Sequence, residues 1–229
     1  MRNGGPTGAL LLLVLALTAC GTETAPDTGP PLGAGHQALE SGPQVLDLVS
    51  RITEESRLTR LPKISITVPE GWFNFDGWAM SKGREPTTTF VTFWDVDRVY
   101  STPCRWKYRP MVVPGRGVDG LASALVKQPL RKATRPVEVE LGGFPGKYLE
   151  WSVPANIDFI DCDEGVFESW TARGWASDRY QQTPGQVDRI WILNVYGGRL
   201  VVDASYLPAA TAEDRAELDR VVDSIRFLD

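Results

Sequence analysis

Histidine is almost absent from this sequence, and its scarcity excludes several kinds of chemistry. The one histidine among 229 residues is His36, which lies in a stretch rich in Gly and Pro. A Ser-His-Asp or Cys-His catalytic set needs a histidine in the folded domain, and a histidine zinc site needs one as a ligand. We therefore expect neither kind of site, and we predict no cofactor.

Long apolar runs and clusters of basic residues are also missing. The main apolar run, 9–17, is too short to span a membrane, because a helix crossing a hydrocarbon layer of about 30 Å needs about 20 apolar residues. Positive and negative residues are interspersed, and the net charge is −5. Because nucleic acids are bound by basic patches, we expect no nucleic-acid partner.

The N-terminus has the features of an export signal. Arg2 precedes the apolar run, and Leu17-Thr18-Ala19-Cys20-Gly21 follows it. A charged start, a short apolar run and small residues are typical of a secretory signal. Residues 17–21 resemble the lipobox of bacterial lipoproteins. This resemblance implies cleavage before Cys20 and a diacylglycerol on its sulfur. Two acyl chains are enough for stable anchoring. The alternative is an ordinary secretory signal in which Cys20 is accidental.

This interpretation predicts three regions. Residues 1–19 are the signal peptide, and residues 20–43 are a lipidated cysteine and a flexible tether of Pro, Gly and Thr. Residues 44–229 form a single domain. The whole chain is 42% hydrophobic and 23% charged, which is ordinary for a globular protein. We expect a monomeric domain held by its lipid on the outer face of the cell membrane.

Two of the three cysteines remain after Cys20 is assigned to lipid. In an exported protein Cys104 and Cys162 are a natural disulfide pair. A bridge that closes a loop of roughly 60 residues stabilises by roughly 4 kcal/mol in the chain-entropy model. The alternative is two buried free thiols.

Hydrophobic periodicity predicts a fold of strands with a few helices. The strands are expected at 64–68, 73–80, 87–96, 137–141, 144–153, 167–171, 190–196 and 200–206. Helices are expected over 45–57, at 118–128 and after Thr211, where Asp214 completes a capping box. A short closing strand is expected near 225–228. A long loop is expected over 173–187. These elements predict an α+β fold, an antiparallel sheet of hairpins and meanders with two or three helices packed on it.

Both ends of this domain resemble the Mog1/PsbP-like α/β/α sandwiches. The resemblance rests on Ile64–Trp72, which ends in Pro-Glu-Gly-Trp, on the Gly197-Gly198 hairpin, and on 212–227, which ends in Ser-Ile-Arg-Phe. Arg outnumbers Lys and Asn is scarce, as in the GC-rich coding of actinomycetes. Lipoproteins of this general form imply binding or assembly roles, and no catalytic residue is transferred.

Aromatic residues next to arginine are the first candidate for a binding surface. Trp106 and Arg109 lie in an irregular stretch, and Trp170 and Trp175 flank Arg173. Exposed aromatics beside arginine are typical of recognition surfaces. The alternative is that these side chains are partly buried under long loops.

Two further motifs have chemical interpretations. The carboxylates Asp158, Asp161, Asp163 and Glu164 share one loop and could hold Ca²⁺, although their order is not that of an EF-hand and a solvated acidic loop is the alternative. Residues 115–120 match G-x-G-x-x-G, but the βαβ pattern of a dinucleotide site is missing, so glycines of a loop explain them better.

The sequence therefore leaves three hypotheses for function. The leading one is a lipid-anchored extracytoplasmic binding or interaction module for an envelope protein or wall component. The second is a cell-envelope hydrolase that uses Asp and Glu carboxylates, for which no pair can be nominated. The third is a structural lipoprotein that accompanies a membrane protein.

Overall fold

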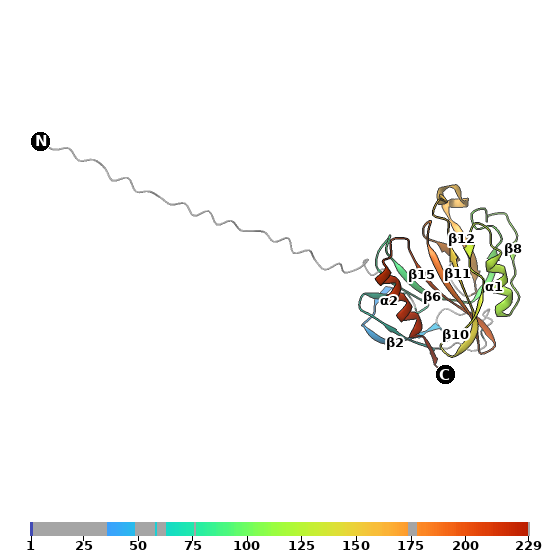
Figure 1. Ribbon diagram of the computed structural model, residues 1–229, viewed down its shortest axis with the longest axis horizontal. Helices are drawn as coiled ribbons and strands as arrows, with labels where there is room; N and C mark the ends of the chain where they lie inside the picture. Colours follow the sequence, from blue (N-terminus) through green and yellow to red (C-terminus); the bar gives the residue numbers. More distant parts are fainter. Residues whose placement is uncertain (2–35, 49–57, 59–62, 76, 174–177, 229) are drawn as a thin grey trace.

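A sheet of nine antiparallel strands forms the centre of the molecule (Figure 1). The computed structural model describes residue 1 and residues 36–48, 58, 63–75, 77–173 and 178–228. The strands run in the order β1 (His36–Ala38), β4 (Trp72–Phe75), β5 (Ala79–Lys82), β6 (Thr89–Trp94), β15 (Gly198–Tyr206), β14 (Val187–Val195), β11 (Phe144–Ser152) and β10 (Val137–Leu141), and β9 (Lys132–Ala133) also pairs with β11.

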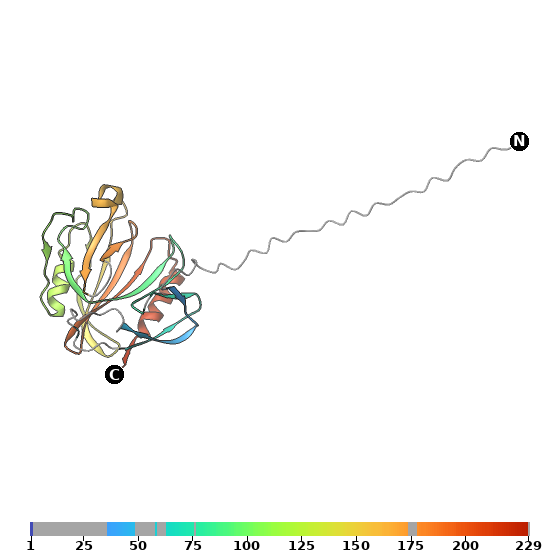
Figure 2. The same ribbon diagram turned by 180° about the vertical axis from the view of Figure 1, so that it is seen from behind.

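One face of this sheet is covered by α2 (Ala212–Asp223) and by a three-stranded sheet. That sheet has the order β16 (Arg226–Leu228), β3 (Lys63–Val68) and β2 (Gly42–Asp47), so it joins the last strand of the chain to an early one. Figure 2 shows the same neighbourhood from behind. Ile64, Ile66 and Leu218 are fully buried in the hydrophobic core on this face.

The other face is covered by α1 (Val118–Val126) and by a four-stranded sheet. Its order is β13 (Arg179–Gln181), β12 (Phe167–Ala172), β7 (Val96–Tyr100) and β8 (Met111–Val112). Leu121, Leu125 and Trp170 pack here against Trp151 and Ile190 of the central sheet. Two short 3₁₀ turns, η2 (Phe159–Asp161) and η3 (Asp163–Gly165), lie between β11 and β12.

Several sequence predictions are confirmed. The hairpin expected at Gly197-Gly198 joins β14 to β15, which pair antiparallel over their whole length. Its two turn residues are Tyr196 and Gly197, both at positive φ, and Gly198 is the first residue of β15. Thr211 caps α2, and Asp214 completes the capping box by accepting from the Thr211 backbone N–H at 2.8 Å. The antiparallel sheets and the short closing strand are also present.

The balance of helix and strand differs from the expectation. The described residues contain two α-helices, and these lie on opposite faces of the central sheet, as Figure 1 also shows. Strands make up most of the regular secondary structure in the described part, so the fold is mostly β, built of antiparallel sheets.

The expected helix over 45–57 is wrong where the structure describes it. Its first residues belong to β2, which pairs with β3. Leu46 and Leu48 are buried while Val45 is 60% exposed, so the chain follows the two-residue period of a strand. Pairing with β3 overrides the helical spacing of the apolar residues. Residues 49–57 lie outside the described part.

Three other boundaries need correction. The tether was predicted to reach residue 43, but β1 pairs with β4 and β2 begins at Gly42, so the ordered domain begins earlier. The single strand over 73–80 is the hairpin of β4 and β5, in which the Asn74 side chain accepts from the Gly77 N–H at 3.0 Å. The long loop over 173–187 contains β13, which pairs with β12.

Candidate functional site

A pocket with a volume of about 280 Å³ opens between the central sheet and β13. Its walls are mostly apolar, with five aromatic side chains and a small polar group. The aromatic residues are Phe75, Trp78, Phe90, Trp94 and Tyr180. The polar residues are Thr92, Asp178, Arg179, Gln182 and Ser205, and Ala79 and Met80 complete the lining. An apolar cavity with a few convergent polar groups is the usual form of a small-molecule site.

Strand alternation places most of this lining. Phe90, Thr92 and Trp94 are every second residue of β6, so they project from the same face of the central sheet. Trp78 packs edge-on against Trp94, with ring centroids 4.8 Å apart. The indole N–H of Trp94 donates to the Thr92 hydroxyl at 2.7 Å, which fixes the orientation of that ring.

The wall opposite the sheet is β13, whose side chains alternate as well. Arg179 and Gln181 point into the protein and are buried, whereas Tyr180 between them is 48% exposed. Gln181 donates to the Ser169 hydroxyl at 2.9 Å. Tyr180 is therefore an aromatic side chain that lines the pocket from a strand held in place by its two buried neighbours.

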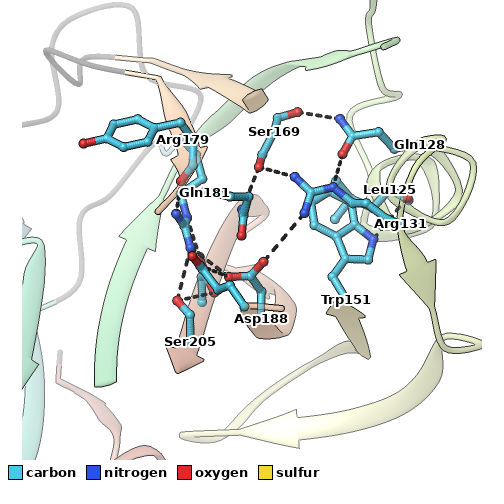
Figure 3. A network of polar contacts seen from close by, with 12 residues as sticks. Leu125, Gln128, Arg131, Trp151, Ser169, Arg179, Gln181, Asp188 and Ser205 are labelled. Atoms are coloured by element: carbon cyan, nitrogen blue, oxygen red, sulfur yellow. Dashed lines mark hydrogen bonds and ion pairs between the residues drawn. The ribbon is translucent and has the colours of Figure 1, made fainter. Parts of the chain in front are cut away.

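Arg179 attaches this wall to the central sheet through buried ion pairs. Its Nε donates to Asp203 at 2.8 Å, and its Nη2 donates to Asp188 at 2.8 Å and to the Ser205 hydroxyl at 3.1 Å. Figure 3 shows these side chains converging from β13, β14 and β15. Because both carboxylates are fully buried, the guanidinium neutralises charge that water cannot reach.

Arg131 extends the network beneath α1. Its guanidinium lies 4.1 Å from the centroid of the Trp151 ring, and its Nε donates to Gln128 at 2.5 Å. Its Nη2 donates to the Ser169 hydroxyl at 2.5 Å, and its Nη1 lies 3.8 Å from Asp188 Oδ2 (Figure 3). Two arginines and two aspartates therefore form one buried cluster with no net formal charge.

Burial perturbs the ionisable groups of this cluster. Removal from water raises the pKa of Asp203 to about 6, with the charge of Arg179 opposing the shift. Burial also lowers the pKa of Arg131 to about 9, although Asp188 opposes this shift. Beside the cluster, burial and then the negative charge of Asp178 raise the pKa of the Glu168 carboxyl to about 7.

The residues proposed from sequence as a binding surface do not gather in one place. Trp170 is fully buried in the core, which excludes it from a surface. Trp106 is half-buried and its indole N–H donates to the Val166 carbonyl at 3.2 Å, and Arg173 pairs with Asp97. Arg109 is exposed, and Trp175 lies outside the described residues. Partial burial, the alternative weighed for these side chains, describes Trp106 and Arg173.

Most carboxylates of the acidic loop, residues 158–164, form hydrogen bonds or ion pairs within the protein. Asp158 accepts from the Ile160 N–H at 2.9 Å. Asp163 accepts from the Lys107 N–H and pairs with Arg105, while Glu164 pairs with Lys107. Across the described residues, no group of three or more His, Cys, Asp or Glu side chains is arranged to hold a metal ion. Asp161 is the fourth carboxylate of the loop. The four carboxylates therefore do not converge on a calcium site.

The predicted disulfide is confirmed. Cys104 and Cys162 are joined, with Cα atoms 4.4 Å apart, so the bridge fixes the acidic loop to the segment that holds Trp106. The 115–120 glycines have a structural use. A Cβ at Gly120 would come within 2.8 Å of the Gly115 nitrogen, so the close approach of two backbone segments requires glycine there.

The polar residues of the site were not predicted from sequence. A signal for them is present, because Asp203 and Ser205 alternate with Val202 and Ala204 in an otherwise hydrophobic strand. A charged residue on the inward side of a buried strand needs a buried partner. The sequence does not show that the partner is Arg179, because that pairing depends on the placement of β13.

Comparison with known proteins adds no assignment. Within the described residues, no helix is long and apolar enough to cross a membrane. No known family model matches this sequence, and no curated protein matches it.

Proposed function

We propose that this protein is a lipid-anchored extracytoplasmic binding module whose ligand site is the pocket between the central sheet and β13. The observation that carries the proposal is the lining of that pocket, in which five aromatic side chains surround a small polar group. Aromatic rings supply large contact areas, and a few fixed polar groups supply orientation.

The buried ionic cluster supports this assignment. Arg179, Asp188 and Asp203 hold β13 against the central sheet, so the polar wall of the pocket is rigid before any ligand arrives. Buried ion pairs are weak evidence for stability, because apolar side chains of the same volume often stabilise a fold as well or better. A preformed binding site gives them a functional reason, because it lowers the entropy lost on binding.

The experiment is a thermal-shift screen on the chain from residue 21 onward, without lipid. The panel contains wall fragments, sugars, lipids, peptides, organic cations, Ca²⁺ and a chelator. A ligand at about 100 times its Kd stabilises by about 2.7 kcal/mol, which a melting curve resolves. A shift that is clearly smaller in Tyr180→Leu than in the wild type supports the pocket. A flat panel would contradict a small-ligand function and leave the structural lipoprotein, tested by co-purification from solubilised membranes.

The membrane anchor is part of the same proposal and rests on the N-terminal sequence. Cys20 follows a short apolar run and lies outside the described residues. Metabolic labelling with a palmitate analogue should label the wild type and fail in Cys20→Ala, which should leave the membrane fraction. Labelling that persists in the variant would contradict lipidation at Cys20.

The hydrolase hypothesis has one observation in its favour. Burial, and then the negative charge of Asp178 in the pocket wall, raises the pKa of the Glu168 carboxyl to about 7. A carboxyl that keeps its proton near neutral pH can act as a general acid. Activity on wall polymers that is lost in both Glu168→Gln and Asp178→Asn would favour this function over simple binding.

We also propose that the domain is related to the Mog1/PsbP-like sandwiches. Support comes from β3 and β16, two segments that carry the resemblance, because Arg226 and Phe227 pair with Ser65 and Ile64. An experimental structure superposed on members of that family tests the proposal, and a different strand order in the aligned sheets would contradict it.

A further inference from the structure

The charge of the pocket wall indicates the ligand class more closely than the shape of the pocket does. Asp178 lines the pocket, and its carboxylate accepts from the Tyr100 hydroxyl at 2.5 Å. That donor is neutral, and no described Lys or Arg forms an ion pair with Asp178. Asp178 therefore contributes a negative charge that the described part of the protein does not neutralise by a direct pair.

The one cationic side chain in the lining does not offset this charge. Arg179 donates to Asp203, Asp188, Ser205 and the Tyr180 carbonyl, and it is 5% exposed. Its positive charge is taken up by two carboxylates behind the pocket wall. Among the described lining residues, a ligand in the cavity therefore meets the carboxylate of Asp178 and no cation beyond Arg179.

The neighbouring ionisable groups respond to the same negative charge. Burial is the main cause of the raised pKa of Glu168, and Asp178 raises it further. Burial and the hydrogen bond to Asp178 likewise raise the pKa of the Tyr100 hydroxyl. Asp178 is the carboxylate in the described lining, and Glu168 and Tyr100 beside it hold their protons more tightly, so a negatively charged ligand would be repelled by Asp178 and a positively charged one attracted.

The remaining lining is suited to a cation that carries apolar groups. Trp, Tyr and Phe rings attract cations through the negative faces of their π systems, and five such rings line this cavity. A compact ammonium with alkyl substituents is weakly hydrated, so it gives up little water on entering. The cavity volume of about 280 Å³ admits one small molecule or the head group of a larger one.

We propose that the pocket binds an alkylated ammonium group, which sits among the aromatic rings with Asp178 as its counter-ion. This inference rests on the proposed function, because it names the ligand class of the same pocket. The ammonium group can belong to a free small molecule or to a lipid head group. Both present the same chemistry to the site.

The test is a titration of the chain from residue 21 onward, which lacks the proposed lipid anchor, in detergent-free buffer, monitored by calorimetry and tryptophan fluorescence. The probes are choline, its uncharged carbon analogue in which a tert-butyl group replaces the trimethylammonium group, and phosphatidylcholine vesicles. Choline should bind at least about tenfold more tightly than the uncharged analogue. Binding of choline alone indicates a free ligand, and binding of the vesicles alone indicates a head group.

Three variants locate the effect. Asp178→Asn keeps an acceptor for Tyr100 and removes the charge, so choline should bind about tenfold more weakly while the uncharged analogue is unaffected. Tyr180→Leu keeps apolar area and removes a ring, so it should weaken choline binding severalfold. Asp119→Asn removes a carboxylate whose side chain is 85% exposed on α1 and should change nothing.

Two results would overturn the inference in distinguishable ways. Equal affinity for choline and its uncharged analogue would mean that the pocket recognises shape alone, which refutes cation recognition and leaves the proposed binding function standing. If neither choline nor the vesicles show saturable binding, the ligand class is wrong. The thermal-shift screen then decides separately whether the pocket binds anything.

Discussion

The two faces of the central sheet are buried by different chemistry. Beneath α2 and the three-stranded sheet the packed residues are hydrophobic, and Glu217, which pairs with Lys82, lies at the margin of this face. Beneath α1 and β13, the apolar core adjoins two arginines and two aspartates that are buried and paired. The apolar face contributes stability through the burial of hydrophobic surface, whereas the polar face fixes the positions of particular side chains.

The polar face is also the face that carries the candidate site. Natural sequences depart from simple hydrophobic packing mainly at functional or strained positions. Here the departure adjoins the aromatic pocket, and Arg179 and Ser205 belong to both. Variants on the two faces should therefore separate stability from ligand affinity.

The largest expected effect is on the polar face. Asp188 lies between Arg179 and Arg131, and Asp188→Asn leaves the two arginines with one buried carboxylate, so the free energy of unfolding should fall by about 3–5 kcal/mol. Urea unfolding at neutral pH measures the loss. Asp119→Asn, which breaks an exposed pair with Lys147, should lose less than about 1 kcal/mol. Equal losses in the two variants would contradict the importance of the buried cluster.

The disulfide should have a comparable effect at the edge of the polar face. Replacing both Cys104 and Cys162 with alanine releases a long loop, and the chain-entropy model gives a loss of about 4 kcal/mol. A reductant should destabilise the wild type and leave the double variant unchanged. Identical unfolding curves with and without reductant in the wild type would show that the bridge does not form in solution.

A truncation on the apolar face should affect stability alone. Leu218 is fully buried on α2, and Leu218→Ala should lower the free energy of unfolding by about 3 kcal/mol through lost burial and a cavity. The affinity for the ligand found in the screen should not change below the melting temperature. A loss of affinity in this variant would remove the proposed division between the two faces.

The smallest expected effect is a dependence on pH. Burial raises the pKa values of Asp203 and Glu168 to about 6 and about 7, from ordinary values of 3.8 and 4.5. Because these carboxyls hold protons more tightly when folded, their contribution to stability is complete below about pH 4 and is lost as the pH rises through about 6–7.

Glu168→Gln tests this dependence directly. The melting temperature of the wild type should fall between about pH 5 and about pH 8, and the fall should be shallower in the variant because one of the two titrating groups is gone. Asp178, Arg179 and Tyr100 surround Glu168 and remain in place. A steeper fall in the variant would mean that the raised pKa belongs to another group.

Elements with local signals were predictable. The glycines at 197 and 198 between two hydrophobic runs indicate the β14–β15 hairpin, although the turn residues are Tyr196 and Gly197. Thr211 with Asp214 specifies the start of α2. The Cys104–Cys162 bridge was predictable because assigning Cys20 to the proposed lipid anchor leaves two cysteines and one pairing. In each case the deciding residues lie close together in sequence or are few.

Elements that depend on distant partners were not predictable. β2 forms because β3 offers a pairing edge, and β13 is three residues long and is held by β12 and by the ion pairs of Arg179. The pocket unites Trp78 with Asp178, so no local pattern could reveal it. The aromatic-arginine pattern misled because Trp170 serves the core.

The most direct test of the pocket compares two matched variants. Tyr180→Leu removes a ring from the pocket, and Tyr108→Leu removes one that is 91% exposed in the loop with Trp106 and Arg109. The measurement is ligand-induced thermal stabilisation of both variants and the wild type. The pocket account predicts that the shift is smaller in Tyr180→Leu and unchanged in Tyr108→Leu. The reverse result would contradict it and place the binding surface on that loop.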